Sequence, residues 1–176
     1  LLLARFLGLE EFGRFSIAWM IVYFVSTFQY AMILSPMMSL GPKESEENYP
    51  TYFGSILVHQ IIFALFWAAL AFGGLWVFDL AQPDFKLGVY ALPLGAALFA
   101  FQMQDFIRRY FFTVGQVHWA LVNDALSYVG QVLAFVTLAY TISLTGTLAI
   151  WSIAITSLLA CIIGLIQMNF KLPSWE

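Results

Sequence analysis

The sequence predicts an all-α membrane protein, a polytopic bundle of transmembrane helices. Hydrophobic residues make up 62% and charged residues 10% of its 176 residues, against roughly 45–50% and about 25% in soluble domains. The mean hydropathy is +0.87. A soluble domain of this size still exposes roughly a third of its unfolded surface, so this chain requires a solvent that is partly lipid. Lipid admits helices or closed barrels, and the alternating ten-residue segments of a barrel are not seen.

Uncharged runs of about 20 residues mark the expected transmembrane helices. The runs 15–34, 52–78 and 87–104 each predict one helix. The longer run 125–170 is right for two helices, with turn-forming residues at 141–146 between them. The resulting expected spans are 1–7, 13–34, 53–78, 87–107, 120–140 and 147–168.

Residues 1–7 are apolar but rise only about 10 Å as a helix, a third of a bilayer core. They lack the basic region that precedes the hydrophobic core of a signal peptide. We therefore expect the tail of a first helix and a sequence that is a fragment. Residues 1–176 would form one six-helix lobe, made of this remnant and five complete helices.

The basic residues predict an orientation in the membrane. One side carries Lys43, Arg108, Arg109 and Lys171. The other side carries Arg14 and Lys86, with Arg5 a doubtful third. By the positive-inside rule, the side with Arg108 and Arg109 is expected to be cytoplasmic.

Several classes of function find no support in the residues. A net charge of −3 with scattered basic residues excludes a nucleic-acid partner. The single cysteine, Cys161, reads as a small packing residue. No catalytic motif and no metal-ligand spacing is present. We expect neither an enzyme nor a bound cofactor or metal.

Arg108 and Arg109 stand side by side at the end of the fourth expected helix. A pair of guanidiniums binds phosphate through charge-assisted hydrogen bonds, so the two residues are candidates for a phosphate clamp. The alternative is a topology anchor beside the aromatic residues 110–112. The two interpretations are compatible.

Asp124 and Asn123 lie near the start of the fifth expected helix. The residues that share a helical face with Asp124 are Ser127, Tyr128 and Gln131. Ionisable groups at membrane depth usually face a cavity or pair with a partner, here Arg108 or Arg109. Asp124, Asn123 and Gln131 are thus candidate charge partners or coupling-ion ligands, and helix capping by Asn123 and Asp124 is the alternative.

Other polar residues lie inside the expected helices. His59 is a candidate proton relay, although a hydrogen bond between helices is the commoner role. Gln29 and Tyr30 are candidates for lining a cavity near the cytoplasmic end of their helix. Gln102 and Gln104 read as contacts between helices.

Three segments resemble a known family. ARFLGLEEFGRFSIAW at 4–19, SPMM at 35–38, and FIRRYFFTVGQ at 106–116 followed by ALVNDALSYVGQ at 120–131 are similar to the polysaccharide-export flippases. That family comprises O-antigen and exopolysaccharide flippases, and it is related to lipid II flippases and to MATE drug exporters. The resemblance covers only the N-terminal half of a member, and it implies one lobe of a two-lobed, MATE-like fold.

The resemblance also implies a substrate and partners. The substrate would be a glycan on polyprenyl pyrophosphate in a bacterial inner membrane, and no cofactor is implied. Its diphosphate would need cationic groups, for which this lobe offers Arg5, Arg14, Arg108 and Arg109. Asp124 would balance charge or respond to protons or sodium. The partners would be the bilayer, the C-terminal lobe of the same chain, and glycan polymerase or assembly proteins.

Three alternatives stay open. A MATE-like multidrug antiporter would need an acidic cation site, for which only Asp124 qualifies. A non-transporting scaffold subunit of a glycan-assembly complex would need no site at all. A membrane-bound glycosyltransferase or acyltransferase would need acidic pairs or a catalytic histidine, which are not evident.

Overall fold

The computed structural model describes residues 2–168, and no strand occurs in that range. The α-helices are α1 (Leu2–Gln29), α2 (Ser35–Leu40), α3 (Tyr49–Ala81), α4 (Ala91–Thr113), α5 (Val117–Asp124), α6 (Gly130–Thr141) and α7 (Gly146–Gln167). Two π-helical segments, η1 (Tyr30–Leu34) and η5 (Ala125–Val129), join α1 to α2 and α5 to α6. Three 3₁₀ turns are η2 (Gly41–Lys43), η3 (Pro83–Phe85) and η4 (Gly88–Tyr90).

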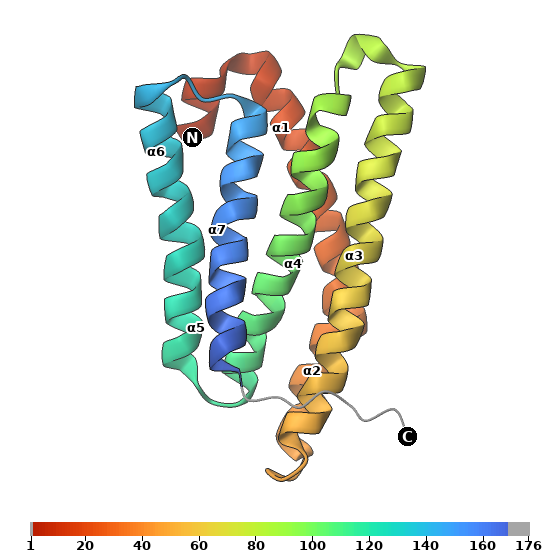
Figure 1. The fold of residues 1–176 in the computed structure, drawn as a ribbon, viewed down its shortest axis with the longest axis vertical. Coiled ribbons are helices and arrows are strands. Elements are labelled where there is room, and N and C mark those ends of the chain that lie inside the picture. The colour runs from red at the N-terminus through yellow and green to blue at the C-terminus, as the bar shows by residue number, and fades with distance from the viewer. Residues whose placement is uncertain (1, 169–176) are drawn as a thin grey trace.

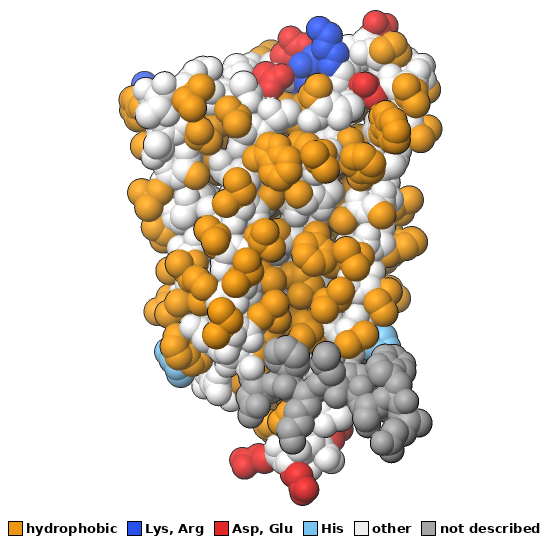
Figure 2. Space-filling model, in the orientation of Figure 1, with side chains coloured by type: hydrophobic (Ala, Val, Ile, Leu, Met, Phe, Trp, Pro, Cys, Tyr) orange, Lys and Arg blue, Asp and Glu red, His pale blue; other side chains and the backbone are white. Residues whose placement is uncertain are grey.

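Four helical stretches are long and apolar enough to cross a membrane, which indicates a membrane protein. They are Leu3–Lys43, Tyr49–Ala81, Val117–Thr141 and Gly146–Gln167. Figure 2 shows hydrophobic side chains along the middle of one face and charged side chains at its two ends. The all-helical class is confirmed, while the six-helix lobe remains a prediction.

The long helices run side by side and alternate in direction (Figure 1). The start of α1 and the connections α3–α4 and α6–α7 lie at one end, which we call the Glu11 end. The connections α2–α3 and α4–α5 lie at the other, which we call the Arg108 end. α4 packs between α3 and α7 and is the central element.

The start of α1 is bent at Gly8. This residue has φ 74° and ψ 167°, a backbone conformation that glycine alone adopts readily. Residues 2–7 therefore form a short helical segment that does not continue the axis of the rest of α1. The bend falls between the expected spans 1–7 and 13–34.

Close packing around α4 relies on small residues. A Cβ on Gly164 of α7 would lie 2.5 Å from Cγ2 of Ile107, and one on Gly95 would lie 3.2 Å from the Ala68 carbonyl oxygen of α3. Ala160, one turn before Gly164, is fully buried. Small residues of this kind let helix backbones approach in the absence of a hydrophobic driving force.

Candidate functional site

A carboxylate on α4 holds both arginines. Asp105 Oδ1 accepts a hydrogen bond from Nη2 of Arg108, and its Oδ2 accepts one from Nε of Arg109 at 3.0 Å. The spacing of three and four residues places the three side chains on one face of the helix. Asp105 is 10% exposed, whereas the arginine side chains are 22% and 27% exposed.

A second carboxylate reaches the arginines from another helix. Oδ1 of Asp124, at the end of α5, lies 3.7 Å from Nη1 of Arg108. Nε2 of Gln104 lies 3.4 Å from the same oxygen. Two carboxylates and two guanidiniums thus form a charged cluster, defined as Asp105, Arg108, Arg109 and Asp124, whose formal charges cancel at neutral pH.

Aromatic side chains flank the charged cluster on both sides. The guanidinium carbon of Arg109 lies 5.1 Å from the ring centroid of Tyr30, a cation–π contact. Tyr128 follows Asp124 by four residues and so lies on the same face of its helix. Tyr30 belongs to η1 and Tyr128 to η5, so a π-helical segment borders the cluster on each side. Such segments occur frequently at functional sites.

Two buried polar atoms at the cluster have no hydrogen-bond partner among the described residues. They are Oε1 of Gln104 and Nε of Arg108. One is an acceptor and the other a donor, and both side chains contact Asp124. Buried polar groups are normally paired, so these two atoms favour the binding of a further polar group beside Asp124.

The arginines near the N-terminus lie far from the charged cluster. Nη1 of Arg14 donates to Oε1 of Glu11 at 3.0 Å, and Nη2 of Arg14 donates to Glu10. From Arg14 to Tyr30, which contacts Arg109, the helix rises about 24 Å. Arg5 is exposed and precedes Phe6, whose ring packs against Tyr140 at the end of α6. The four arginines therefore occupy opposite ends of the bundle and do not form one cationic site.

Gln29 does not line a cavity among the described residues. It is 0% exposed, and its Nε2 donates to Oε1 of Gln60 at 3.1 Å and to the Gln102 carbonyl oxygen at 2.7 Å. These bonds join α1, α3 and α4. Its neighbour Tyr30 is 47% exposed and belongs to the site.

Asn123 and Gln131 are also used in packing. Nδ2 of Asn123 donates to the Ala160 carbonyl oxygen at 2.9 Å, and its Oδ1 accepts from Gln104 at 2.8 Å. Nε2 of Gln131 donates to Oγ of Ser127 at 3.2 Å. Neither side chain has a described contact with a charged group, and their role as charge partners or coupling-ion ligands stays a prediction.

His59 lies in the first half of α3. Its Nδ1 is 2.8 Å from the Ser55 carbonyl oxygen, within its own helix. The expected bond to another helix is not among the described contacts, and no described carboxylate pairs with the imidazole. Within residues 2–168 there is also no group of three His, Cys, Asp or Glu that could hold a metal ion. Lys171, used to predict the orientation, lies outside the described residues.

Asp105 is the functional residue that the sequence interpretation missed. Its position three and four residues before Arg108 and Arg109 is the signal that identifies it, because such pairs meet on a helix.

No protein-family model matches this sequence, and neither a curated protein nor a solved structure matches it.

Proposed function

We propose that the chain is the N-terminal lobe of a membrane transporter that flips lipid-linked oligosaccharide across a bacterial cytoplasmic membrane. The substrate would be a glycan carried on polyprenyl pyrophosphate. The observation that carries the proposal is the pair of guanidiniums held by Asp105 at the end of a bundle with a hydrophobic middle. The resemblance in sequence supplies the substrate class.

The guanidinium pair suits a diphosphate. Each guanidinium has five N–H donors in a planar fork. Asp105 binds Nη2 of Arg108 and Nε of Arg109, which fixes both side chains and prearranges further N–H groups for a second anion. A diphosphate offers several oxygens, so it can bridge both guanidiniums.

The two carboxylates of the cluster make this binding reversible. An incoming anion competes with Asp105 and Asp124 for the same guanidiniums, which lowers its affinity. A transporter needs such a balance because it must release what it binds. In our proposal the Arg108 end is cytoplasmic, where the lipid-linked substrate is made.

A second candidate function, a cation-coupled multidrug antiporter, is favoured by one observation. Asp105 and Asp124 both approach Arg108, so protonation or cation binding at either carboxylate would redistribute the guanidinium between α4 and α5. That arrangement suits ion coupling, and it is also compatible with a coupled flippase.

Deletion and complementation test the proposal. The parent gene is deleted from a glycan-producing host, which then receives wild type, Arg108→Ala/Arg109→Ala, Arg108→Lys/Arg109→Lys or Asp124→Ala. Surface polysaccharide and lipid-linked precursor in each leaflet are measured. Lys86→Ala is the matched control, because Lys86 is an exposed cation at the Glu11 end.

We expect the deletion and the double alanine variant to trap precursor in the cytoplasmic leaflet. The double lysine variant should restore export only in part, because lysine lacks the bidentate fork. Normal surface glycan in the deletion strain, together with increased drug sensitivity, would support the antiporter instead. Normal export by a well-expressed double alanine variant would show that the two arginines act only as topology anchors.

A further inference from the structure

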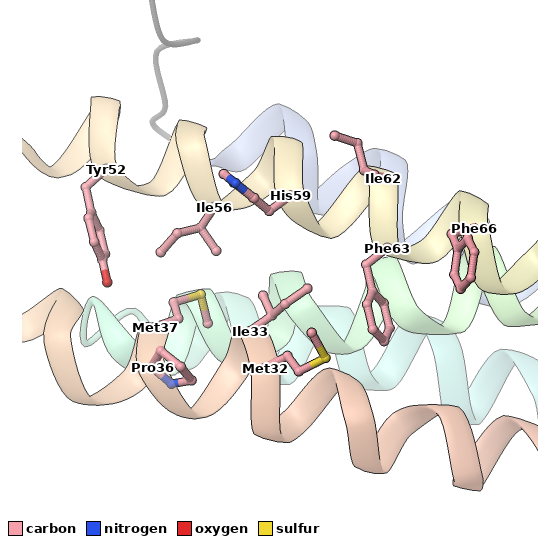
Figure 3. Close-up of a pocket in the computed structure, with 10 residues that line it drawn as sticks. All are labelled: Met32, Ile33, Pro36, Met37, Tyr52, Ile56, His59, Ile62, Phe63 and Phe66. Carbon is pink, nitrogen blue, oxygen red and sulfur yellow. The ribbon is translucent and has the colours of Figure 1, made fainter.

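A hydrophobic groove separates η1 and α2 from α3. Its volume is about 510 Å³. Met32, Pro36 and Met37 of η1 and α2 form one wall, and Ile56, His59 and Phe63 of α3 form the other. Figure 3 shows the two sets of side chains facing one another across the gap.

The groove follows the direction of the helices and lies within two of the candidate membrane spans. It extends from Tyr52 to Phe66, a helical rise of about 21 Å. One leaflet of the hydrocarbon core is about 15 Å deep. The groove therefore reaches from the interface at the Arg108 end to about the middle of the membrane.

The wall formed by η1 and α2 is adaptable. Met32 and Met37 are unbranched, flexible side chains that fit irregular apolar partners. Pro36 stands at the start of α2, next to the π-helical segment that ends at Leu34. These features suit a flexible hydrocarbon chain better than a rigid helix of a partner.

Charged residues stand at the mouth of the groove. Glu44 lies in the connection from α2 to α3, which joins the two walls close to Tyr52 at the outer end of the groove. Lys43 directly precedes Glu44, and Glu46 and Glu47 follow. The α2–α3 connection at the mouth is therefore predominantly acidic. An ammonium beside Glu44 and a phosphate beside Lys43 would be complementary to it, whereas a head group with net negative charge would be repelled.

We propose that this groove binds one acyl chain of a phospholipid with a zwitterionic, primary-amine head group, such as phosphatidylethanolamine. The acyl chain lies between α3 and the segment formed by η1 and α2, and the ammonium of the head group faces Glu44. This lipid differs from the anionic polyprenyl substrate of the proposed function, and the site does not depend on that function.

Photocrosslinking in nanodiscs tests the site. The purified chain is placed in phosphatidylcholine nanodiscs that contain a small fraction of phosphatidylethanolamine with a diazirine in one acyl chain. A phosphatidylglycerol probe with the same chain measures the preference for the head group. Adducts are mapped by mass spectrometry. We expect them to concentrate on Met32, Ile56 and Phe63, with a higher yield from the amine probe.

Two variants test the binding of the acyl chain and the recognition of the head group separately. Ile56→Trp fills the groove and should abolish the local adducts, whereas Leu133→Trp on the exposed face of α6 should not. Glu44→Gln should reduce the preference for the amine probe by about fivefold, the effect of one charge at a membrane surface. Asp84→Asn, which removes an exposed carboxylate in η3 at the Glu11 end, is its matched control.

Three results would overturn the proposal. Adducts spread evenly over lipid-facing helices would indicate bulk lipid alone. Equal yields from the two probes, unchanged by Glu44→Gln, would remove the head-group assignment. Protection of the groove from both probes, together with crosslinks between two chains, would mean that a second copy covers it. Because Glu44 lies in a loop, its variant keeps the test decisive if Ile56→Trp does not fold.

Discussion

Arg108 on α4 and Asp124 on α5 approach within 3.7 Å across the turn that joins their helices. The same guanidinium also donates to Asp105 of its own helix. Arg108 thus contacts two carboxylates, Asp105 of its own helix and Asp124 of the next helix. A change in either carboxylate alters how α4 and α5 are held together at this end.

Asp105→Ala should destabilise the bundle more than Glu10→Ala. Asp105 is 10% exposed and binds two guanidiniums, whereas Glu10 is 81% exposed and pairs only with Arg14. Hydrogen bonds to charged groups contribute about 1.5–3 kcal/mol, and exposed ion pairs contribute about 0–1 kcal/mol. Unfolding of both variants in detergent measures the difference. Equal losses would mean that water, rather than Asp105, satisfies the arginines.

Asp105→Asn should also change binding of the anion. The substitution keeps the size of the side chain but removes the charge that competes for the guanidiniums. We expect tighter binding of a polyprenyl pyrophosphate analogue to the purified protein and slower export in cells. The opposite result, weaker binding, would show that Asp105 acts mainly by orienting Arg108 and Arg109.

The contact between Tyr30 and Arg109 depends on the aromatic ring. Tyr30→Phe keeps the ring face over which the guanidinium lies, whereas Tyr30→Leu removes it. A cation–π contact at a partly exposed site is worth about 0.5–1 kcal/mol. We expect Tyr30→Leu to lose that much stability in detergent and Tyr30→Phe to lose almost none. A similar loss in both variants would assign the effect to the hydroxyl group instead.

The sequence predicted the all-helical class because long uncharged runs leave few alternatives in lipid. It also predicted that Asp124 has a cationic neighbour, because charges at membrane depth need partners. It did not predict which glutamines face inward. Gln29 and Tyr30 are adjacent and equally compatible with a cavity, and only the packing of α1 against α3 and α4 buries one and exposes the other.

The distribution of basic residues in the sequence already places Arg14 and Arg109 on opposite sides of the membrane, whereas the family resemblance joins them as candidates for one diphosphate site. Arg14 and Arg109 carry the same charge, and a family resemblance groups them by chemistry rather than by position. The length of α1 places them at opposite ends, and Glu10 and Glu11 already neutralise Arg14 there. The phosphate-clamp hypothesis therefore applies to the Arg108 end alone.

The buried hydrogen bond between Gln29 of α1 and Gln60 of α3 should couple the stabilities of variants at these two residues. Gln29→Leu leaves Oε1 of Gln60 without its donor, and we expect a loss of about 1 kcal/mol. Gln29→Leu/Gln60→Leu removes the donor and the acceptor together, so its loss should be smaller than the sum of the two single losses. Additive losses in a double-mutant cycle would show that the two amides stabilise the bundle independently.

At the Glu11 end, one carboxylate joins three helices. Oε2 of Glu11 on α1 accepts from the Tyr90 hydroxyl at 2.9 Å and from the backbone N–H of Gly146, the first residue of α7, at 3.0 Å. A carboxylate at a helix N-terminus contributes about 0.3–1 kcal/mol, and up to about 2 kcal/mol where it is partly buried. Glu11→Ala removes this charge, both of these hydrogen bonds and the one from Arg14, so we expect a loss near the upper value in detergent unfolding.

Tyr90→Phe provides the control for this contact, because it removes one hydrogen bond and leaves the carboxylate at α7. It should cost about 1 kcal/mol alone and almost nothing when Glu11 is already alanine, because the two residues share one contact. Export should fall less in Glu11→Ala than in the double alanine variant of Arg108 and Arg109, since Glu11 holds helices together far from the charged cluster. Export lost to the same extent, with the protein still folded, would place the Glu11 end in the transport pathway.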